Sequence, residues 1–464
     1  MAGKAALVLD NPKRDLGGVV LVAYELLKRG VEPYLVPMYQ QGYDIPLIAP
    51  DVVLANYARL NNQALLEGYR SLGCRVMVMD TEGGIVSESG NSAPDNWGRL
   101  FRESGLNQVV DHYFFWGPRI RDAFAAAGAL PADALEVTGC PRYDLCAPQW
   151  RPMLRYRESG FVLVNTNFAT LNPRFSRARE DEMETYMRTG WPRDYTERLF
   201  GELSDNFPRY LDAVEGLARR HAGRRVVIRP HPFENAAFYE KRFGALPNVR
   251  VDAEGEVFNV ISAADCVVHL NCGTAVETLL LGKTPISLEY INRPFLRQHN
   301  HLPSAISCTA HDEAHLDRLI ADPAARAEAW DATAVRERYL EPWFHVIDGK
   351  ASARIAARMA AVEGRTARRS LALSLGSGLA KPRPAQVLQG FAVTIAGSRV
   401  VAAWRAAAVS ARRDKQVAPE TVSALLADYA RCEGSGIKAT VRPARHPLTG
   451  MPLATLHISA AAAS

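Results

Sequence analysis

The sequence has seven cysteines but no CxxC pair among them, which argues against a zinc site or a disulfide framework. It has no run of about 18 apolar residues, so no membrane-spanning helix is expected. The opening stretch MAGKAALVLDNPKRD has an apolar run too short for the core of a signal peptide. No Asp-x-Asp metal motif stands out. These absences favour a cytoplasmic protein that works without a bound metal or cofactor.

Positive charge is concentrated at one end of the chain. The net charge is +5, yet 14 Lys and Arg stand against 4 Asp and Glu from Arg365 onward, which is +10 and leaves −5 for the preceding residues. A basic tail on a mildly acidic body indicates contact with an anionic surface, although a solvated extension is the plainer alternative. We expect that surface to be the inner face of the cytoplasmic membrane, and no nucleic-acid partner.

Short apolar strands alternate with helical stretches along most of the chain, which is typical of βαβ units around a parallel sheet. A first series begins with the strand at 5–9 and the helix at 17–29, and a second begins at 160–168 (GFVLVNTNF). We therefore predict an α/β fold with two Rossmann-like domains facing across a cleft, at 1–150 and 151–364. Residues 365–464 are predicted to be a small accessory extension.

Finer features are also expected inside these domains. The polar stretch 172–200 is interpreted as an excursion or lid, and a helix is expected at 209–223. Within the extension, the strand-like segments IKATVRP and LATLHIS can pair with each other.

The first candidate motif is VMVMDTEGGI at 76–85, where an apolar strand delivers two carboxylates to its end. Gly83 and Gly84 then allow a tight turn and a close approach of substrate to the backbone. Glu82 lies in the loop and is the better placed general base or nucleophile, with Asp80 as the second catalytic candidate. A turn whose acids merely cap the next helix is the alternative.

The second motif is VVIRPHPFEN at 226–235, where two prolines end a strand and hold one histidine at its carboxyl end. Arg229 and His231, next to Pro232, suit an anionic ligand such as a donor phosphate. The alternative is a purely structural or exposed histidine.

The third motif, CVVHLNCGTAVETLLLGKTPISLE at 266–289, runs from a strand into a helix. Asn271, Gly273 and Thr274 are predicted to bind a phosphate with the backbone N–H groups of the helix start, and Glu277 a ribose. Simple helix capping by Asn271 and Thr274 is the alternative.

Weaker candidates for substrate contact stand at other strand ends and loops. The segment VNTNF places three polar residues after the first strand of the second domain, TGCPRYD places an arginine at the domain junction, and LDNPKRDLGG places two cations in the first βα loop. These candidates are Asn165, Thr166, Asn167, Arg142, Lys13 and Arg14.

Read together, these stretches resemble the bacterial surface carbohydrate biosynthesis proteins, a glycosyltransferase group of the GT-B type. The matching pieces are DTEGG, FFWG, VTGCPRYD, VNTNF, RPHPFEN and NCGTAVETLLLGKTPIS, in order over residues 5–305. The acidic turn with a His-Pro pair is also similar to sialyltransferases and Kdo transferases, which use CMP-activated sugars. That resemblance implies that Glu82 is catalytic and that His231 holds the CMP phosphate.

The expected function is therefore transfer of a sugar, with Kdo or another nonulosonate from a CMP donor favoured, to a glycan or lipid-linked acceptor of a surface polysaccharide. A UDP-sugar or CDP-polyol donor is one alternative. The stretch HPFEN and the Gly-Thr helix are also similar to UDP-GlcNAc 2-epimerases, which is a second. A non-catalytic partner of polysaccharide assembly or export is a third.

Overall fold

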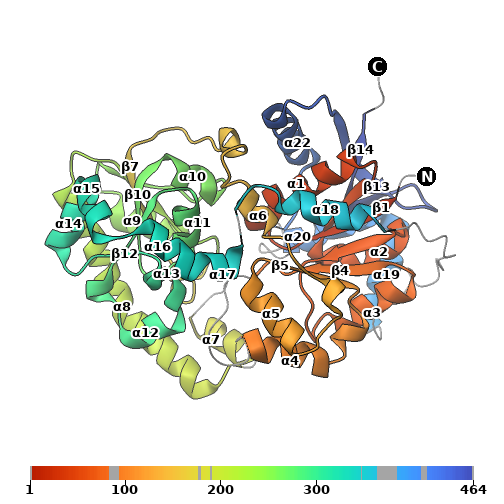
Figure 1. Ribbon diagram of the computed structural model, residues 1–464, viewed down its shortest axis with the longest axis horizontal. Coiled ribbons are helices and arrows are strands. Elements are labelled where there is room, and N and C mark those ends of the chain that lie inside the picture. The colour runs from red at the N-terminus through yellow and green to blue at the C-terminus, as the bar shows by residue number, and fades with distance from the viewer. Residues whose placement is uncertain are drawn as a thin grey trace. The chain divides into compact units, whose positions relative to one another are not determined.

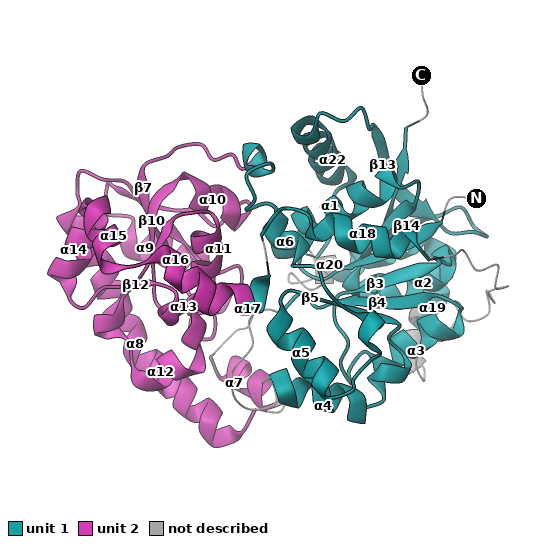
Figure 2. Cartoon of the chain, viewed as in Figure 1, with its two compact units in different colours: residues 1–153, 342–464 teal, residues 154–341 magenta. Residues whose placement is uncertain are grey.

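The computed structural model describes residues 3–82, 94–175, 179–188, 191–345, 347–362, 384–408 and 415–461. The chain divides into two compact units, which Figure 2 shows in different colours. Residues 1–153 and 342–464 form unit 1, and residues 154–341 form unit 2. The sequence led us to expect boundaries at 150 and 364, but the chain returns to unit 1 at Pro342 and its tail belongs to that unit.

Unit 1 is built on an eight-stranded sheet in the order β13-β14-β2-β1-β3-β4-β5-β6 (Figure 1). The last six strands of this order are parallel, and β14 adds to the β2 edge antiparallel, with Leu456 opposite Leu35. The strands are β1 (Lys4–Leu9), β2 (Glu32–Pro37), β3 (Val52–Ala55), β4 (Arg75–Met79), β5 (His112–Phe115), β6 (Leu135–Val137), β13 (Ala439–Arg445) and β14 (Pro452–Ala460).

The tail completes unit 1 and does not form a sheet of its own. The predicted pairing of its two strands is seen as the antiparallel β13–β14 pair. Helix α22 (Pro419–Glu433) packs on α1 (Pro12–Lys28), where the Tyr429 hydroxyl donates to the Gly17 carbonyl at 2.8 Å. The other longer helices of unit 1 are α2 (Gln41–Ile48), α3 (Gln63–Ser71), α4 (Pro94–Glu103), α5 (Pro118–Ala126), α18 (Ala351–Ala360), α19 (Pro384–Ala396) and α20 (Ser398–Ala408).

Helix α1 begins earlier than the sequence analysis predicted. Asn11 caps it by accepting the Lys13 N–H at 3.2 Å, and Pro12 occupies the first turn, where a missing N–H costs nothing. Lys13 and Arg14 therefore lie in the first helical turn and not in a loop.

Unit 2 is built on a six-stranded, fully parallel sheet in the order β12-β11-β10-β7-β8-β9. Apolar side chains of β7, β8 and β10 form its core with α8 and α14. The strands are β7 (Phe161–Asn165), β8 (Val226–Arg229), β9 (Val249–Val251), β10 (Ala264–His269), β11 (Thr284–Ser287) and β12 (Cys308–Thr309). The principal helices are α7 (Arg179–Arg188), α8 (Arg193–Arg220), α9 (Ala236–Phe243), α10 (Val257–Ala263), α11 (Thr274–Leu280), α12 (Pro294–His299), α13 (His301–Ala305), α14 (Glu313–Ala321) and α15 (Pro323–Ala329).

The polar stretch 172–200 is more regular than expected. Its described residues include α7 and the first turns of α8, so the helix predicted at 209–223 is the last part of a 28-residue helix. The predicted class, α/β with two mainly parallel sheets, is confirmed. Among the residues that the structure describes, no helix is long and apolar enough to cross a membrane.

Candidate functional site

The strand order of unit 2 reverses between β7 and β10. The chain passes from β7 to β8 and β9 on one side, and continues with β10, β11 and β12 on the other. Open α/β sheets bind ligands outside the carboxyl ends of their strands at such a reversal. Two predicted residues meet there, because Asn165 Nδ2 donates to Thr274 Oγ1 at 2.7 Å.

Asn165 leaves one acceptor unused at this point. Its backbone carbonyl accepts the Tyr210 hydroxyl at 3.1 Å, and the residue is 2% exposed. Within the described part of the chain, no donor reaches Asn165 Oδ1. A buried oxygen without a donor costs about 1–3 kcal/mol, so a hydrogen bond from a ligand hydroxyl or amine to Asn165 Oδ1 would be favourable.

Thr166 and Glu234 hold the loop that carries His231 in place. The His231 N–H donates to Thr166 Oγ1 at 3.2 Å, and that hydroxyl donates to Glu234 Oε2. The other oxygen of Glu234 accepts the Phe168 N–H. Burial raises the pKa of Glu234, and these hydrogen bonds oppose that rise. Thr166, expected from the sequence to contact substrate, is seen here positioning the His231 loop.

His231 is half-buried, whereas Pro232 and Phe233 are exposed. Its Nδ1 accepts the Phe233 N–H at 3.3 Å, so the neutral ring carries its proton on Nε2. The Phe233 ring packs edge-on against the imidazole at 5.5 Å. An N–H donor fixed at a strand end suits an anionic oxygen of a ligand.

Arg229 has partners that the sequence did not suggest. Its guanidinium donates to the backbone carbonyls of Asp252, Glu254 and Gly255, and the residue is 8% exposed. Burial lowers its pKa, and Asp252 opposes the decrease. These bonds hold the loop after β9, so Arg229 is engaged with protein carbonyls and is absent from the donor site proposed below.

Asn271 and Asn167 hold the loop after β10 in place. Asn271 has φ +49, exchanges two hydrogen bonds with the Asn292 amide at 2.9 and 3.0 Å, and accepts the Ser304 hydroxyl at 3.1 Å. Its carbonyl accepts Asn167 Nδ2 at 2.9 Å. The side chains of Asn271 and Asn167 are thus engaged in hydrogen bonds that fix this loop.

The start of α11 offers less to a phosphate than the sequence suggested. The Ala275 and Val276 N–H groups already donate to the carbonyls of Cys272 and Gly273, both at 3.1 Å. The helix is seven residues long, and Glu277 is 2% exposed within it. The Thr274 side chain, bound to Asn165, is the better polar contact here.

A cavity of about 490 Å³ adjoins the loops after β11 and β12. Ser304, which bonds to Asn271, lies in its wall, and this links the cavity to the reversal point. No motif in the sequence indicates this cavity, because its polar residues are spread over four short segments. It is lined by Glu289, Tyr290, Arg297, His301, Ser304, Ala305, Thr309 and His311.

In unit 1 the two predicted catalytic acids have different surroundings. Asp80 is 1% exposed, and its Oδ2 lies 3.1 Å from Arg59 Nη2. Burial raises its pKa, and the positive charge of Arg59 opposes the increase. Its Oδ1 accepts the Glu82 N–H at 2.9 Å, so Asp80 positions the turn that presents Glu82.

The Glu82 side chain is 64% exposed and its Oε1 lies 3.0 Å from Arg14 Nη1. The same guanidinium binds Asp15 at 2.7 Å and Asp10 at 3.1 Å. Burial lowers the pKa of Arg14, but these three carboxylates raise it by more. Glu82 is therefore a solvent-facing carboxylate beside a cation that stays charged.

The other candidates of unit 1 lie near this cluster or outside the described residues. Lys13 is half-buried in the first turn of α1, and Arg142 has its guanidinium over the Tyr143 ring at 5.5 Å. The predicted contacts of Gly83 and Gly84 lie outside the described residues. Within the described ranges, no group of three or more His, Cys, Asp or Glu could hold a metal ion.

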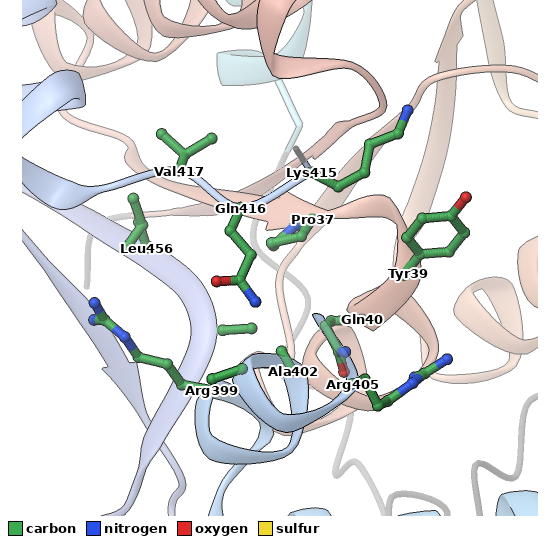
Figure 3. A pocket seen from close by; sticks show the side chains of 12 residues that line it. Pro37, Tyr39, Gln40, Arg399, Ala402, Arg405, Lys415, Gln416, Val417 and Leu456 are labelled. Carbon is green, nitrogen blue, oxygen red and sulfur yellow. The ribbon is translucent and has the colours of Figure 1, made fainter. Parts of the chain in front are cut away.

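A second cavity, of about 290 Å³, lies at the carboxyl end of β2 (Figure 3). Gln416 points into it, and Arg399 and Arg405 of α20 extend along its edge. Lys415 also lines it and pairs with Asp10 at 3.1 Å. A chain of ion pairs through Asp10 and Arg14 thus connects this cavity to Glu82.

Several solved structures are similar to this chain. A UDP-N-acetylglucosamine 2-epimerase gives a TM-score of 0.47 at 15% identity, covering 77% of this chain and 96% of that one. The UDP-GlcNAc 2-epimerase from Neisseria meningitidis, solved with UDP-GlcNAc, gives 0.45 at 13% identity, covering 77% and 99%. The wall teichoic acid polymerase TagF gives 0.45 at 11% identity, covering 76% and 88%.

Identities and scores at this level assign no activity to the chain. In sequence, neither a family model nor a curated protein matches it.

Proposed function

We propose that the protein is a glycosyltransferase that takes a nucleotide-activated sugar and acts in the synthesis of a bacterial surface glycan. Unit 2 would hold the donor, and Glu82 of unit 1 would act on the acceptor. The observation that carries the proposal is the meeting of Asn165 and Thr274 where the strand order of unit 2 reverses, with an unused buried acceptor on Asn165.

In this proposal the Nε2–H of His231 donates to a phosphate oxygen of the donor. Thr274 and Asn165 would contact the neighbouring hydroxyl groups, and the 490 Å³ cavity has room for the nucleoside. Hydrogen bonds would stabilise the negative charge on the leaving phosphate, so the proposed transfer would need no metal. CMP is the favoured nucleotide and Kdo or another nonulosonate the favoured sugar, on the resemblance given above.

Glu82 would remove the proton of the acceptor hydroxyl or stabilise the positive charge of the sugar in the transition state. Its exposure leaves it accessible to an acceptor, and Asp80 fixes its backbone. Arg14, 3.0 Å from Glu82 Oε1, would orient the carboxylate. A glycan or lipid-linked acceptor would then dock on unit 1.

The donor half is tested by titrating CMP, UDP and CDP against the wild type, His231→Gln and Asn165→Leu by calorimetry. We expect CMP to bind most tightly and both variants to lose about tenfold or more, the value of one or two hydrogen bonds to a charged ligand. His221→Gln at the end of α8, a histidine outside the lining of the 490 Å³ cavity, is the matched control and should bind as the wild type does. Unchanged nucleotide affinity in both variants would show that the donor does not bind at this position.

The catalytic half is tested by nucleotide release from CMP-Kdo, CMP-sialic acid, UDP-GlcNAc and CDP-glycerol with membrane extract as acceptor. Glu82→Gln should lower the rate at least about 100-fold with unchanged CMP affinity, and Glu67→Gln on α3 should not lower it. Near-wild-type transfer by Glu82→Gln would exclude its catalytic role.

Two other functions make different predictions in the same assays. A nucleotide-sugar epimerase would interconvert UDP-GlcNAc and its 2-epimer without any acceptor. A non-catalytic assembly partner would bind none of the three nucleotides.

A further inference from the structure

Helices α19 and α20 form a hairpin whose inner face is fixed to unit 1. Val393 and Val401 are buried together with Tyr43 of α2. At the turn, the Ser398 hydroxyl accepts the Ala454 N–H of β14 at 2.5 Å. The hairpin therefore has a defined orientation, with one face inward and one outward.

The outward face is strongly apolar. Leu388, Phe391 and Ile395 follow each other at helical spacing on α19 and are 70%, 52% and 72% exposed. On α20, Val400 and Trp404 are 52% and 73% exposed. Single exposed apolar residues are ordinary, but five of them on two packed helices make a patch of the kind that binds a partner or a lipid surface.

The charge around this patch has one sign. The two helices contain no Asp or Glu, and Arg399 and Arg405 lie at the edge of the cavity beside α20 (Figure 3). In the sequence from Gly364 to Arg413 there are nine Lys and Arg and no Asp or Glu. Such a face is complementary to an anionic lipid surface and would repel a second copy of itself.

The length of the helices decides how they can meet a bilayer. Helix α19 has 13 residues and α20 has 11, well short of the roughly 20 that a spanning helix needs. Exposed apolar side chains with a tryptophan, on helices whose only charged residues are arginines, are typical of helices that lie in the interface.

We propose that the outer face of the α19–α20 hairpin is a docking surface for an anionic lipid bilayer. Leu388, Phe391, Ile395 and Trp404 would enter the boundary of the acyl chains. Arg399 and Arg405 would contact lipid phosphates. This inference does not depend on the proposed activity, and it would keep unit 1 at a membrane whatever the reaction is.

The test uses the full chain and sedimentation with vesicles of phosphatidylcholine alone or with 30% phosphatidylglycerol. We expect binding to the anionic vesicles that weakens in 0.5 M salt and is at least about tenfold weaker on neutral ones. Leu388→Ser with Ile395→Ser should lower the partition coefficient about tenfold or more, because two aliphatic side chains that would enter the bilayer are lost. Leu60→Ser, a substitution of an equally exposed leucine (73%), should leave it unchanged.

Quenching of tryptophan fluorescence by brominated lipid locates the contact. The wild type should be quenched on anionic vesicles, and Trp404→Phe should lose most of that quenching. Vesicle binding that survives the double serine variant, or no binding at all, would overturn the proposal. A dimer in ultracentrifugation that the double variant abolishes, without vesicle binding, would overturn it in favour of self-association.

Discussion

Asp44 offers a prediction whose size can be worked from the structure. Its carboxylate is fully buried in α2, where one oxygen accepts the N–H and the hydroxyl of Thr455 at 3.0 and 2.8 Å. Burial raises the pKa of Asp44 to about 6, and the bonds from Ser398 and Thr455 only partly offset this increase. Asp44 therefore joins α2 to β14 and to the α19–α20 hairpin through a carboxyl group that gives up its proton only near pH 6.

The protons bound by the folded and unfolded chains set the direction in which the free energy of unfolding changes with pH. Between pH 4 and 6 the unfolded chain has released this proton and the folded chain still holds it, so the contribution of Asp44 to stability is lost as pH rises through that window. The difference of about two pKa units corresponds to about 3 kcal/mol. Asp44→Asn removes the titration and keeps an oxygen that can accept from Thr455.

The assay is urea unfolding of the wild type and Asp44→Asn from pH 4 to 7.5, with hydrogen exchange of β14 amides as the local readout. Relative to the wild type, the free energy of unfolding of the variant should rise by about 2.5 kcal/mol between the two ends of this range. Asp95→Asn, whose carboxylate is 78% exposed, is the control and should show no such gain. Parallel pH profiles for the wild type and Asp44→Asn, within about 0.5 kcal/mol, would refute the reasoning.

Two further predictions concern other buried positions. Burial lowers the pKa of His269 to about 4. The free energy of unfolding of unit 2 should therefore fall by about 3 kcal/mol as pH falls from 6.5 to 4. His269→Gln should reduce this pH dependence in acid unfolding followed by hydrogen exchange of β10 amides. A pH-independent β10 in the wild type would contradict this. A Cβ on Gly18 would lie 2.6 Å from the backbone N of Arg142, so Gly18→Ala should lower the free energy of unfolding in urea by about 1–3 kcal/mol. Gly30→Ala is the comparison, because a Cβ there meets no neighbour and only the positive φ of Gly30 is unfavourable for alanine. Equal stability of Gly18→Ala and the wild type would show that α1 and Pro141–Arg142 can move apart.

Local pattern predicted most of the sheet architecture, because a β-branched run bounded by turn residues defines a strand without knowledge of its neighbours. The strand before Asp80 and the one before Pro230 both lie as expected. The pairing of β14 with β2 was not predicted, since Leu456 and Leu35 are far apart in sequence and no local signal joins them. For the same reason the sequence predicts a separate extension at 365–464 where the structure has part of unit 1. Removing this segment would take two strands, β13 and β14, from the sheet, so point substitutions are the sharper test of its role.

The candidate site shows where sequence reasoning stops. Arg229, Thr166 and Asp80 stand in motifs at strand ends, and all three bind the backbone of the chain: carbonyls after β9, the His231 N–H and the Glu82 N–H. A residue type and its spacing cannot tell a side chain that touches a ligand from one that fixes the loop presenting it, because both must lie at the same edge of the sheet. The hydrogen bonds identify Arg229, Thr166 and Asp80 as side chains that fix loops. The ligand contacts proposed for His231 in unit 2 and Glu82 in unit 1 are decided by the binding and transfer assays described above.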